Sequence, residues 1–135
     1  MKVCSLLRAS MTFSQAIRFS VLRELVYARQ AQHANDPNKQ FFHLQNAHVL
    51  GQESTYWHTY VHMLMLRWAW CNRVLPEFTG QLVRVLGAAS KTALGWVPRG
   101  NTGGANVSPF KVMPIPANYA QTIANAKKRV ATWEQ

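Results

Sequence analysis

The sequence predicts an all-α fold of four to five helices, arranged as antiparallel pairs with a long Gly/Pro-rich loop before the last helix. Apolar residues recur at helical spacing in successive segments. Turn-forming residues separate these segments, and a chain of 135 residues has the length of one domain. We therefore expect a flexible extension over residues 1–12 and a single helical domain over 13–135.

The first two expected helices form a pair. The first covers 13–33 and begins after Thr12, which with Gln15 makes a capping-box pattern. A turn with a proline at position 37 separates it from the second helix, at about 39–53. The two helices and their turn resemble one helix-turn-helix unit of the tetratricopeptide kind, without a second copy at a ~34-residue period.

The remaining expected helices lie on either side of the loop. The third, at about 55–74, is apolar on nearly all faces, which is typical of a central, buried helix. The fourth begins near Pro76, because proline suits the first turn, and runs to about Leu94. The loop, 95–116, is rich in glycine and proline, and its end is expected to cross the helices like a strap. The last helix covers 117–133.

Composition excludes several classes of protein. Lys and Arg number 15 against 5 Asp and Glu, a formal charge of +10, yet 48% of the residues are hydrophobic. Such a chain is not disordered, and two distant cysteines, Cys4 and Cys71, do not make a disulfide scaffold. The sequence contains no run of about 18 apolar residues, so it predicts no transmembrane helix. We expect a cytoplasmic protein with reduced thiols, and Met11 is a candidate natural start.

His58 and His62 lie one turn apart on the expected third helix. Two imidazoles at this spacing can bind one transition metal ion, and Met65 extends the pattern by a thioether. The alternative is that they belong to a solvent-exposed edge of the helix (a wet edge), together with other polar residues of the same strip. Spacing alone leaves both interpretations open.

His48 differs because the helical wheel places it between Phe41 and Leu44, and therefore facing inward. A buried imidazole needs partners for both nitrogens, which a backbone carbonyl and a neighbouring side chain can supply. The sharper alternative is that His48 approaches His58 and His62. Three histidines on an antiparallel helix pair can hold zinc, copper, iron or haem. Glu53 or Glu77 can supply an additional oxygen ligand.

Catalytic motifs are missing from the sequence. The metalloprotease pattern His-Glu-x-x-His does not occur, nor does a Gly-x-Ser-x-Gly turn. Cys71 has apolar neighbours and is expected in the core. His43 is expected on a polar, solvated face, as is His33 at the end of the first helix. An enzyme is therefore the less favoured expectation.

The loop contains a candidate anion-binding nest. Successive backbone N–H groups in glycine-rich turns can bind phosphate, and the spacing matches neither a Walker A loop nor a dinucleotide fingerprint. A structural turn whose glycines supply positive φ is the alternative. The candidate cofactor-binding residues are Arg99, Gly100, Asn101, Thr102, Gly103 and Gly104.

Several strings together resemble a known bacterial family of small proteins, the domain of unknown function number 3703. The most specific is the loop, Gly100 to Ser108 followed by Met113-Pro114-Ile115-Pro116, and the resemblance spans roughly 13–117. The family pattern implies histidines at His48, His58 and His62. It implies no activity, and it does not cover the first ten residues or the basic tail.

Three functional hypotheses follow. The first is a transition metal or haem bound through the three histidines. The second is a helical adaptor for an acidic protein partner, suggested by the charge and the repeat-like helix pair. The third is non-specific binding of nucleic acid or other anions, which ranks last because the basic residues are scattered and the tryptophans have core spacing.

Overall fold

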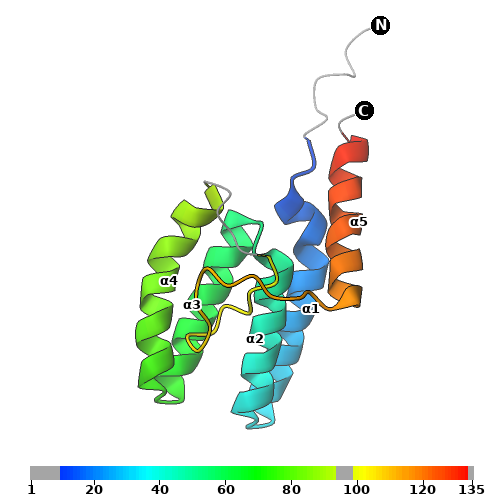
Figure 1. The fold of residues 1–135 in the computed structure, drawn as a ribbon. Coiled ribbons are helices and arrows are strands. Elements are labelled where there is room, and N and C mark those ends of the chain that lie inside the picture. The colour runs from blue at the N-terminus through cyan, green and yellow to red at the C-terminus, as the bar shows by residue number, and fades with distance from the viewer. Residues whose placement is uncertain (1–9, 94–98, 134–135) are drawn as a thin grey trace, which may run out of the picture.

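The computed structural model describes residues 10–93 and 99–133. Within these ranges the chain forms five helices and no strands, so the all-α prediction is confirmed (Figure 1). The helices are α1 (Phe13–His33), α2 (Pro37–Gly51), α3 (Thr55–Cys71), α4 (Leu75–Ala93) and α5 (Ala117–Trp133). None of them, in the part of the chain described, is long and apolar enough to cross a membrane. Most of the expected extension, and residues 94–98 of the expected loop, lie outside the described ranges.

Capping side chains set the helix boundaries. Thr12 and Gln15 form the predicted capping box at the start of α1. The side chain of Asp36 accepts a hydrogen bond from the backbone N–H of Lys39, so α2 begins at Pro37, two residues earlier than expected. Ser54 caps α3 in the same way. Local caps therefore explain both the confirmed and the shifted boundaries.

The helices pack as two pairs, α1 with α2 and α3 with α4, and α2 joins the pairs through α3. The last helix, α5, returns to lie against α1 (Figure 1). The loop before α5 crosses in front of α3 and α2 (Figure 1), and Ile115 near its end packs on the core. The largest fully buried side chains of the apolar core are Ile17, Val21, Leu50, Val61 and Met65.

The expectation that the third helix is buried on most faces is wrong. α3 has many neighbours in α4 and α2 but few in α1, so one face remains open. Trp70 is 69% exposed and partly covers Phe78 of α4. Cys71, expected in the core, is exposed with a free thiol. The apolar residues at the end of this helix therefore cover its surface rather than form its core.

A buried carboxylate joins three helices. Glu24 of α1 is only 4% exposed, and its Oε2 receives hydrogen bonds from His43 at 2.8 Å and Asn46 at 3.2 Å, both on α2. Tyr119 of α5 donates its hydroxyl to Oε1 at 3.3 Å. The prediction that His43 is solvated is wrong, because the side chain pairs with Glu24. This network satisfies a buried acid while holding α5 in place.

The contribution of Tyr119 to the stability of the protein should decrease at alkaline pH. Burial, with the nearby Glu24 carboxylate, raises the pKa of Tyr119 from 10.0 to about 12. The stabilisation is present below pH ~10 and is lost as pH rises toward 12, because the unfolded phenol ionises first. We expect the difference in unfolding free energy between wild type and Tyr119→Phe, from urea titrations, to shrink over this interval. A constant difference would contradict the assignment.

Candidate metal centre

Two helices position three histidines. His48 lies in the last turn of α2, and His58 and His62 lie one turn apart in α3. The link between the helices is three residues long, and Ser54 ends it by capping α3. The antiparallel helices therefore place the end of α2 beside the first turns of α3.

The three imidazoles form a closed triangle. Their ring centroids are 4.8 Å apart for His48 and His58, 4.6 Å for His48 and His62, and 4.9 Å for His58 and His62. One nitrogen from each ring can be chosen so that all three lie within 4.8 Å of one another. The structure thus brings together the three histidines that the sequence identified as candidates.

The wet-edge interpretation of the third helix is wrong. His58 and His62 are 6% and 3% exposed, and His48 is 2% exposed. Thr55 and Asn72, on the same polar strip, are exposed. The strip is therefore divided: its ends face solvent, while its middle is enclosed by α2, α4 and the loop.

The loop encloses His48 directly. The backbone carbonyl of Asn101 lies 2.8 Å from Nδ1 of His48. Gly103 has a φ of +80°, and a Cβ there would come within 2.8 Å of the His48 ring. Asn101 holds the loop in this shape, because its side chain accepts from the N–H of Gly103 and donates to the carbonyls of Ser108 and Lys111. The glycine at 103 is needed for both its conformation and its lack of a side chain.

A buried glutamine on α4 supports His62 from the other side. The Oε1 atom of Gln81 lies 2.7 Å from Nδ1 of His62. Its amide nitrogen donates to Glu77 at 2.6 Å and to the carbonyl of Gly103 at 2.7 Å. The Glu77 carboxylate in turn receives the N–H of Ala105. One glutamine therefore connects α3, α4 and the loop.

These partners determine which ring nitrogens carry protons. The Asn101 carbonyl can only accept, so Nδ1 of His48 must donate. Two acceptors, Glu77 and Gly103, face the nitrogen of Gln81, so its oxygen faces His62 and Nδ1 of His62 also donates. In the neutral rings both Nε2 atoms are consequently lone-pair acceptors. They face each other at 3.1 Å, so two acceptors meet unless a cation lies between them.

The electrostatic surroundings disfavour a proton as that cation. Burial, followed by the nearby His62 and His58, holds the pKa of His48 well below the ordinary value for histidine, although the Asn101 carbonyl acts in the opposite direction. Arg84 of α4 also disfavours a second positive charge there. Its guanidinium donates to the carbonyl of Val107, so it is itself part of the loop's support.

Other predicted ligands are placed differently. Met65 is buried, and its sulfur faces the amide of Gln81 at 3.4 Å. Glu53 is exposed and pairs with Lys127 of α5, away from the histidines. Glu77 is buried beside the cluster but acts on it through Gln81. His33 is exposed, as expected.

The loop residues proposed as an anion nest have mixed surroundings. Gly100 and Gly103 both have positive φ, which fits the structural-turn interpretation. The N–H groups of Gly103 and Ala105 donate to Asn101 and Glu77, so these two donors already have protein acceptors. Arg99 is exposed and Gly104 is buried, and the hydroxyl oxygen of Thr102 is buried without a hydrogen-bond partner among the described residues. Anion binding remains a prediction.

Sequence reasoning did not identify Gln81 as a site residue. A single glutamine on a predicted helix gives no pattern that distinguishes it from a surface residue. The signal that was present is its spacing of four residues from Glu77, which places both side chains on one helix face. The sequence alone does not show that this face of the helix is buried, because the loop that covers it lies farther along the chain.

Gly103→Ala should destabilise the protein by about 1–3 kcal/mol, because it combines an unfavourable φ with overlap on the His48 ring. Gly104→Ala is the matched control, since its new methyl would meet the ends of the Asn106 and Gln45 side chains, which can move. Urea unfolding of both variants measures the difference. Equal losses would show that Gly103 does not pack on His48 as described.

Comparison with known proteins identifies the family but not an activity. No curated protein and no solved structure matched the chain. Residues 15–123 match the model of a family described as a protein of unknown function, DUF3703. Because that match spans most of the sequence and includes the three histidines and the loop that covers them, the chain belongs to the DUF3703 family.

Proposed function

We propose that the protein binds one first-row transition metal ion through His48, His58 and His62. The observation that supports this most strongly is the pair of Nε2 lone pairs, on His48 and His62, facing each other at 3.1 Å inside the protein. A shared metal ion would convert this repulsion into two coordinate bonds. The proposal therefore rests on hydrogen-bond directions and not only on the proximity of the rings.

The spacing of the nitrogens supports a metal with ordinary bond lengths. A Zn–N bond is about 2.0–2.1 Å, so two nitrogens on a tetrahedral ion are about 3.3 Å apart. The Nε2 atoms of His48 and His62 are separated by 3.1 Å, close to that value. A ligand atom of His58 lies within 4.8 Å of the others, so a modest ring movement brings it to the same ion.

The surrounding hydrogen bonds are those that metal-binding histidines generally require. A ligating imidazole usually donates its other N–H to a carbonyl or carboxylate, which fixes its tautomer and orientation. The carbonyl of Asn101 does this for His48, and the side-chain oxygen of Gln81 does it for His62. Glu77, behind Gln81, supplies negative charge next to an otherwise neutral ligand set.

A bare ion fits these contacts better than haem. The rings of His48 and His62 contact each other directly, and the Gly103 backbone packs against His48, so a porphyrin would have to separate groups that are in contact. Imidazole suits zinc, copper, iron and nickel. Three protein ligands would leave a coordination position for water or another small ligand, as in catalytic rather than structural zinc sites.

Metal binding can be tested on protein purified without a polyhistidine tag. We expect one equivalent of zinc or copper to bind. At a free metal concentration of 100 times the dissociation constant, the metal ion should raise the free energy of unfolding by about 2.7 kcal/mol. Cobalt(II) should give the visible absorption of a low-coordinate site. His58→Ala and His62→Ala should each lose the bound ion and the stabilisation.

His33→Ala is the matched control, because His33 is exposed at the end of α1, outside the cluster. It should bind metal as the wild type does. Circular dichroism of each metal-free variant separates loss of a ligand from loss of the fold. Wild-type protein that binds none of zinc, copper, nickel or cobalt would overturn the proposal, as would a loss in His33→Ala equal to that in His62→Ala.

Gln81 should act as a positioning residue for His62. Gln81→Met keeps the side-chain length but removes the oxygen that receives the N–H of His62, so we expect metal affinity to fall about 10–100-fold. Gln81→Glu combined with Glu77→Gln restores an acceptor for His62 without setting two carboxylates side by side, and it should recover part of that affinity. Competition titrations against a chelator measure both. Equal affinity in the two variants would assign Gln81 a purely structural role.

A further inference from the structure

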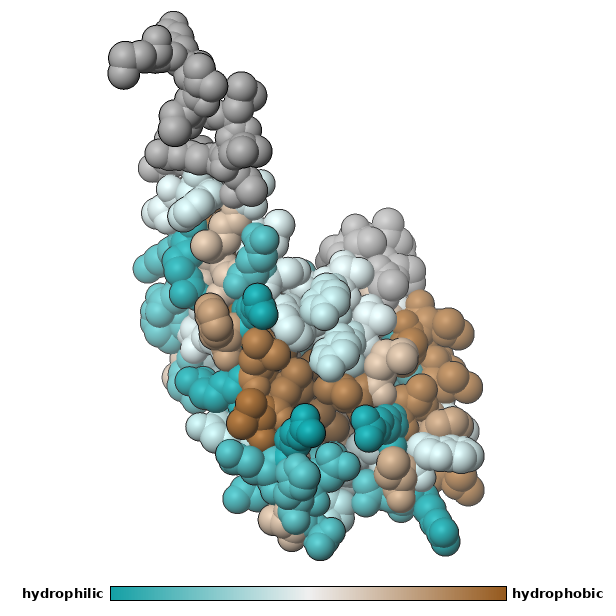
Figure 2. All heavy atoms as spheres, turned by 180° about the vertical axis from the view of Figure 1, so that it is seen from behind, coloured by the Kyte–Doolittle hydropathy of each residue, from teal (hydrophilic) through white to brown (hydrophobic). Residues whose placement is uncertain are grey.

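A long groove lies between α1 and α3, on the face away from the loop. It consists of two hollows, of about 940 Å³ and about 410 Å³, and Tyr60 lines both. On that face exposed hydrophobic side chains gather in the middle of the molecule, with hydrophilic side chains beside and below them (Figure 2). The groove is separate from the histidine cluster, because none of the three histidines lines it.

The groove follows the two helices along most of their length. α1 and α3 run in the same direction, since each is antiparallel to α2 between them. The smaller hollow is lined by the N-terminal halves of both helices, from Ser14 and Tyr56 onward. The larger is lined by their C-terminal halves, as far as His33 and Cys71. From Arg18 to His33 the helix rises about 22 Å. An extended peptide of about seven residues has this length.

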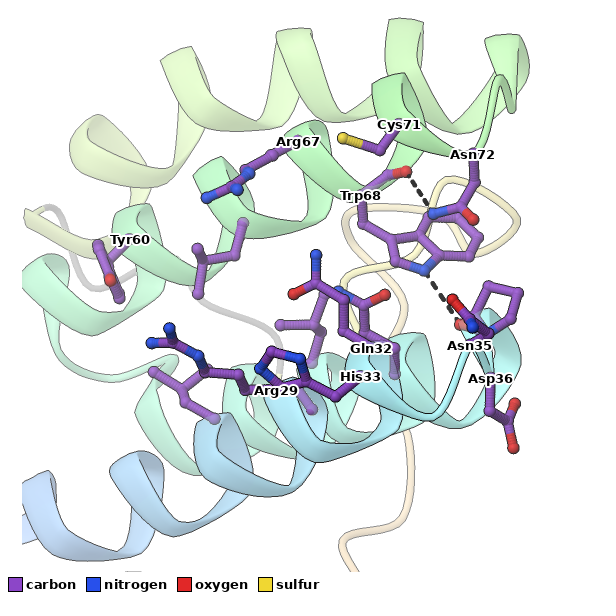
Figure 3. A pocket seen from close by; sticks show the side chains of 16 residues that line it. Arg29, Gln32, His33, Asn35, Asp36, Tyr60, Arg67, Trp68, Cys71 and Asn72 are labelled. Carbon is purple, nitrogen blue, oxygen red and sulfur yellow. Dashed lines mark hydrogen bonds between the residues drawn. The ribbon is translucent and has the colours of Figure 1, made fainter.

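Arginines provide the charge of the groove. Arg18 and Arg29 come from α1 and Arg67 from α3, and Arg29 and Arg67 extend from opposite walls into the same space (Figure 3). Among the described residues, none of the three takes part in an ion pair. Asp36 is the one acid lining the described groove, and it is engaged in capping α2. The groove is therefore lined by three arginines against one carboxylate, and its net charge is positive.

The floor of the groove is apolar. Leu25 and Ala28 of α1, Leu44 of α2 and Leu64 of α3 line the larger hollow. The Trp68 indole is held in place at its end, because it donates to the carbonyl of Pro37 and packs on Phe41. A ligand that fills this space gains by covering apolar surface as well as by neutralising arginine.

We propose that this groove binds an extended acidic segment of a partner protein, with carboxylates on Arg18, Arg29 and Arg67 and apolar side chains on the floor. Alternating side chains of an extended peptide point to opposite sides, so acidic and apolar residues can meet walls and floor separately. The length of the groove favours a polypeptide over a small anion. This inference does not depend on metal binding.

The apolar floor favours a peptide over nucleic acid. A nucleic-acid strand carries a phosphate at every nucleotide and no aliphatic side chains, and its bases stack on aromatic platforms. The smaller hollow contains aromatic residues, Tyr56, Trp57 and Tyr60, on which a base can stack. The floor of the larger hollow is made of leucine and alanine side chains, which offer no such platform, and Trp68 there packs on Phe41. Positive charges spaced along an aliphatic floor match carboxylates alternating with apolar side chains.

Labelled decapeptides can test the proposal on the full chain. The probe alternates Glu with Leu, and its comparison replaces Glu by Gln. We expect fluorescence anisotropy to detect binding of the first at low salt, weakening as salt screens the charges. Arg29→Glu combined with Arg67→Glu should weaken it about tenfold or more. Lys127→Glu combined with Lys128→Glu, on the exposed face of α5, changes the net charge equally and should have little effect.

The location of binding is checked by amide chemical shifts of the isotope-labelled protein. Changes along α1 and α3 support the proposal. Absence of binding, equal binding of the Gln peptide, or equal weakening in the α5 variant would each overturn it. A single-stranded oligonucleotide of ten nucleotides that binds the same groove more tightly than the Glu peptide would overturn the peptide assignment in favour of nucleic acid. Tyr60→Trp, which enlarges the side chain at the junction of the two hollows without changing the charge of the groove, should weaken binding of the peptide.

Discussion

Two imidazole nitrogens that face each other, on His48 and His62, are the constraint around which this fold is organised. Neither ring can relieve the contact by exchanging its proton position, because each uses its other nitrogen to donate to a buried acceptor. Those acceptors come from the loop and from α4, two segments far from the histidines in sequence. The capped link between α2 and α3, the glycine at 103 and the glutamine at 81 all serve this one arrangement.

Because the chain has few acidic residues, the buried carboxylate of Glu77 is an important source of negative charge near the histidines. It is one of five acidic residues in the chain, and it is buried where α4 meets the loop. It accepts hydrogen bonds from the N–H of Ala105 and from the amide of Gln81, which in turn faces His62. Its charge therefore reaches His62 through a neutral amide. A carboxylate at this distance stabilises positive charge in the cluster without occupying a ligand position.

Most of the secondary structure could be predicted because its causes are local. Apolar spacing and the Thr12 cap determine α1 without reference to the rest of the fold. The Asp36 cap is equally local, although the expected start of the second helix at 39 overlooked it. The inward orientation of His48 followed from the same spacing. The burial of His58 and His62 could not follow, since it depends on the loop and α4. The pairing of His43 with Glu24, and the exposure of Trp70, likewise depend on which helices become neighbours.

The position of the loop over the histidines has a kinetic consequence. His48, His58 and His62 are all buried, and the backbone around Gly103 closes the side of His48 that α3 does not cover. Anything the imidazoles take up must enter through a transient opening of this segment or of α4, and must leave by the same route. The opening frequency of the loop, whose described residues 99–116 contain no helix or strand, then sets an upper limit on the rate of exchange with solvent, however strong or weak the equilibrium affinity is.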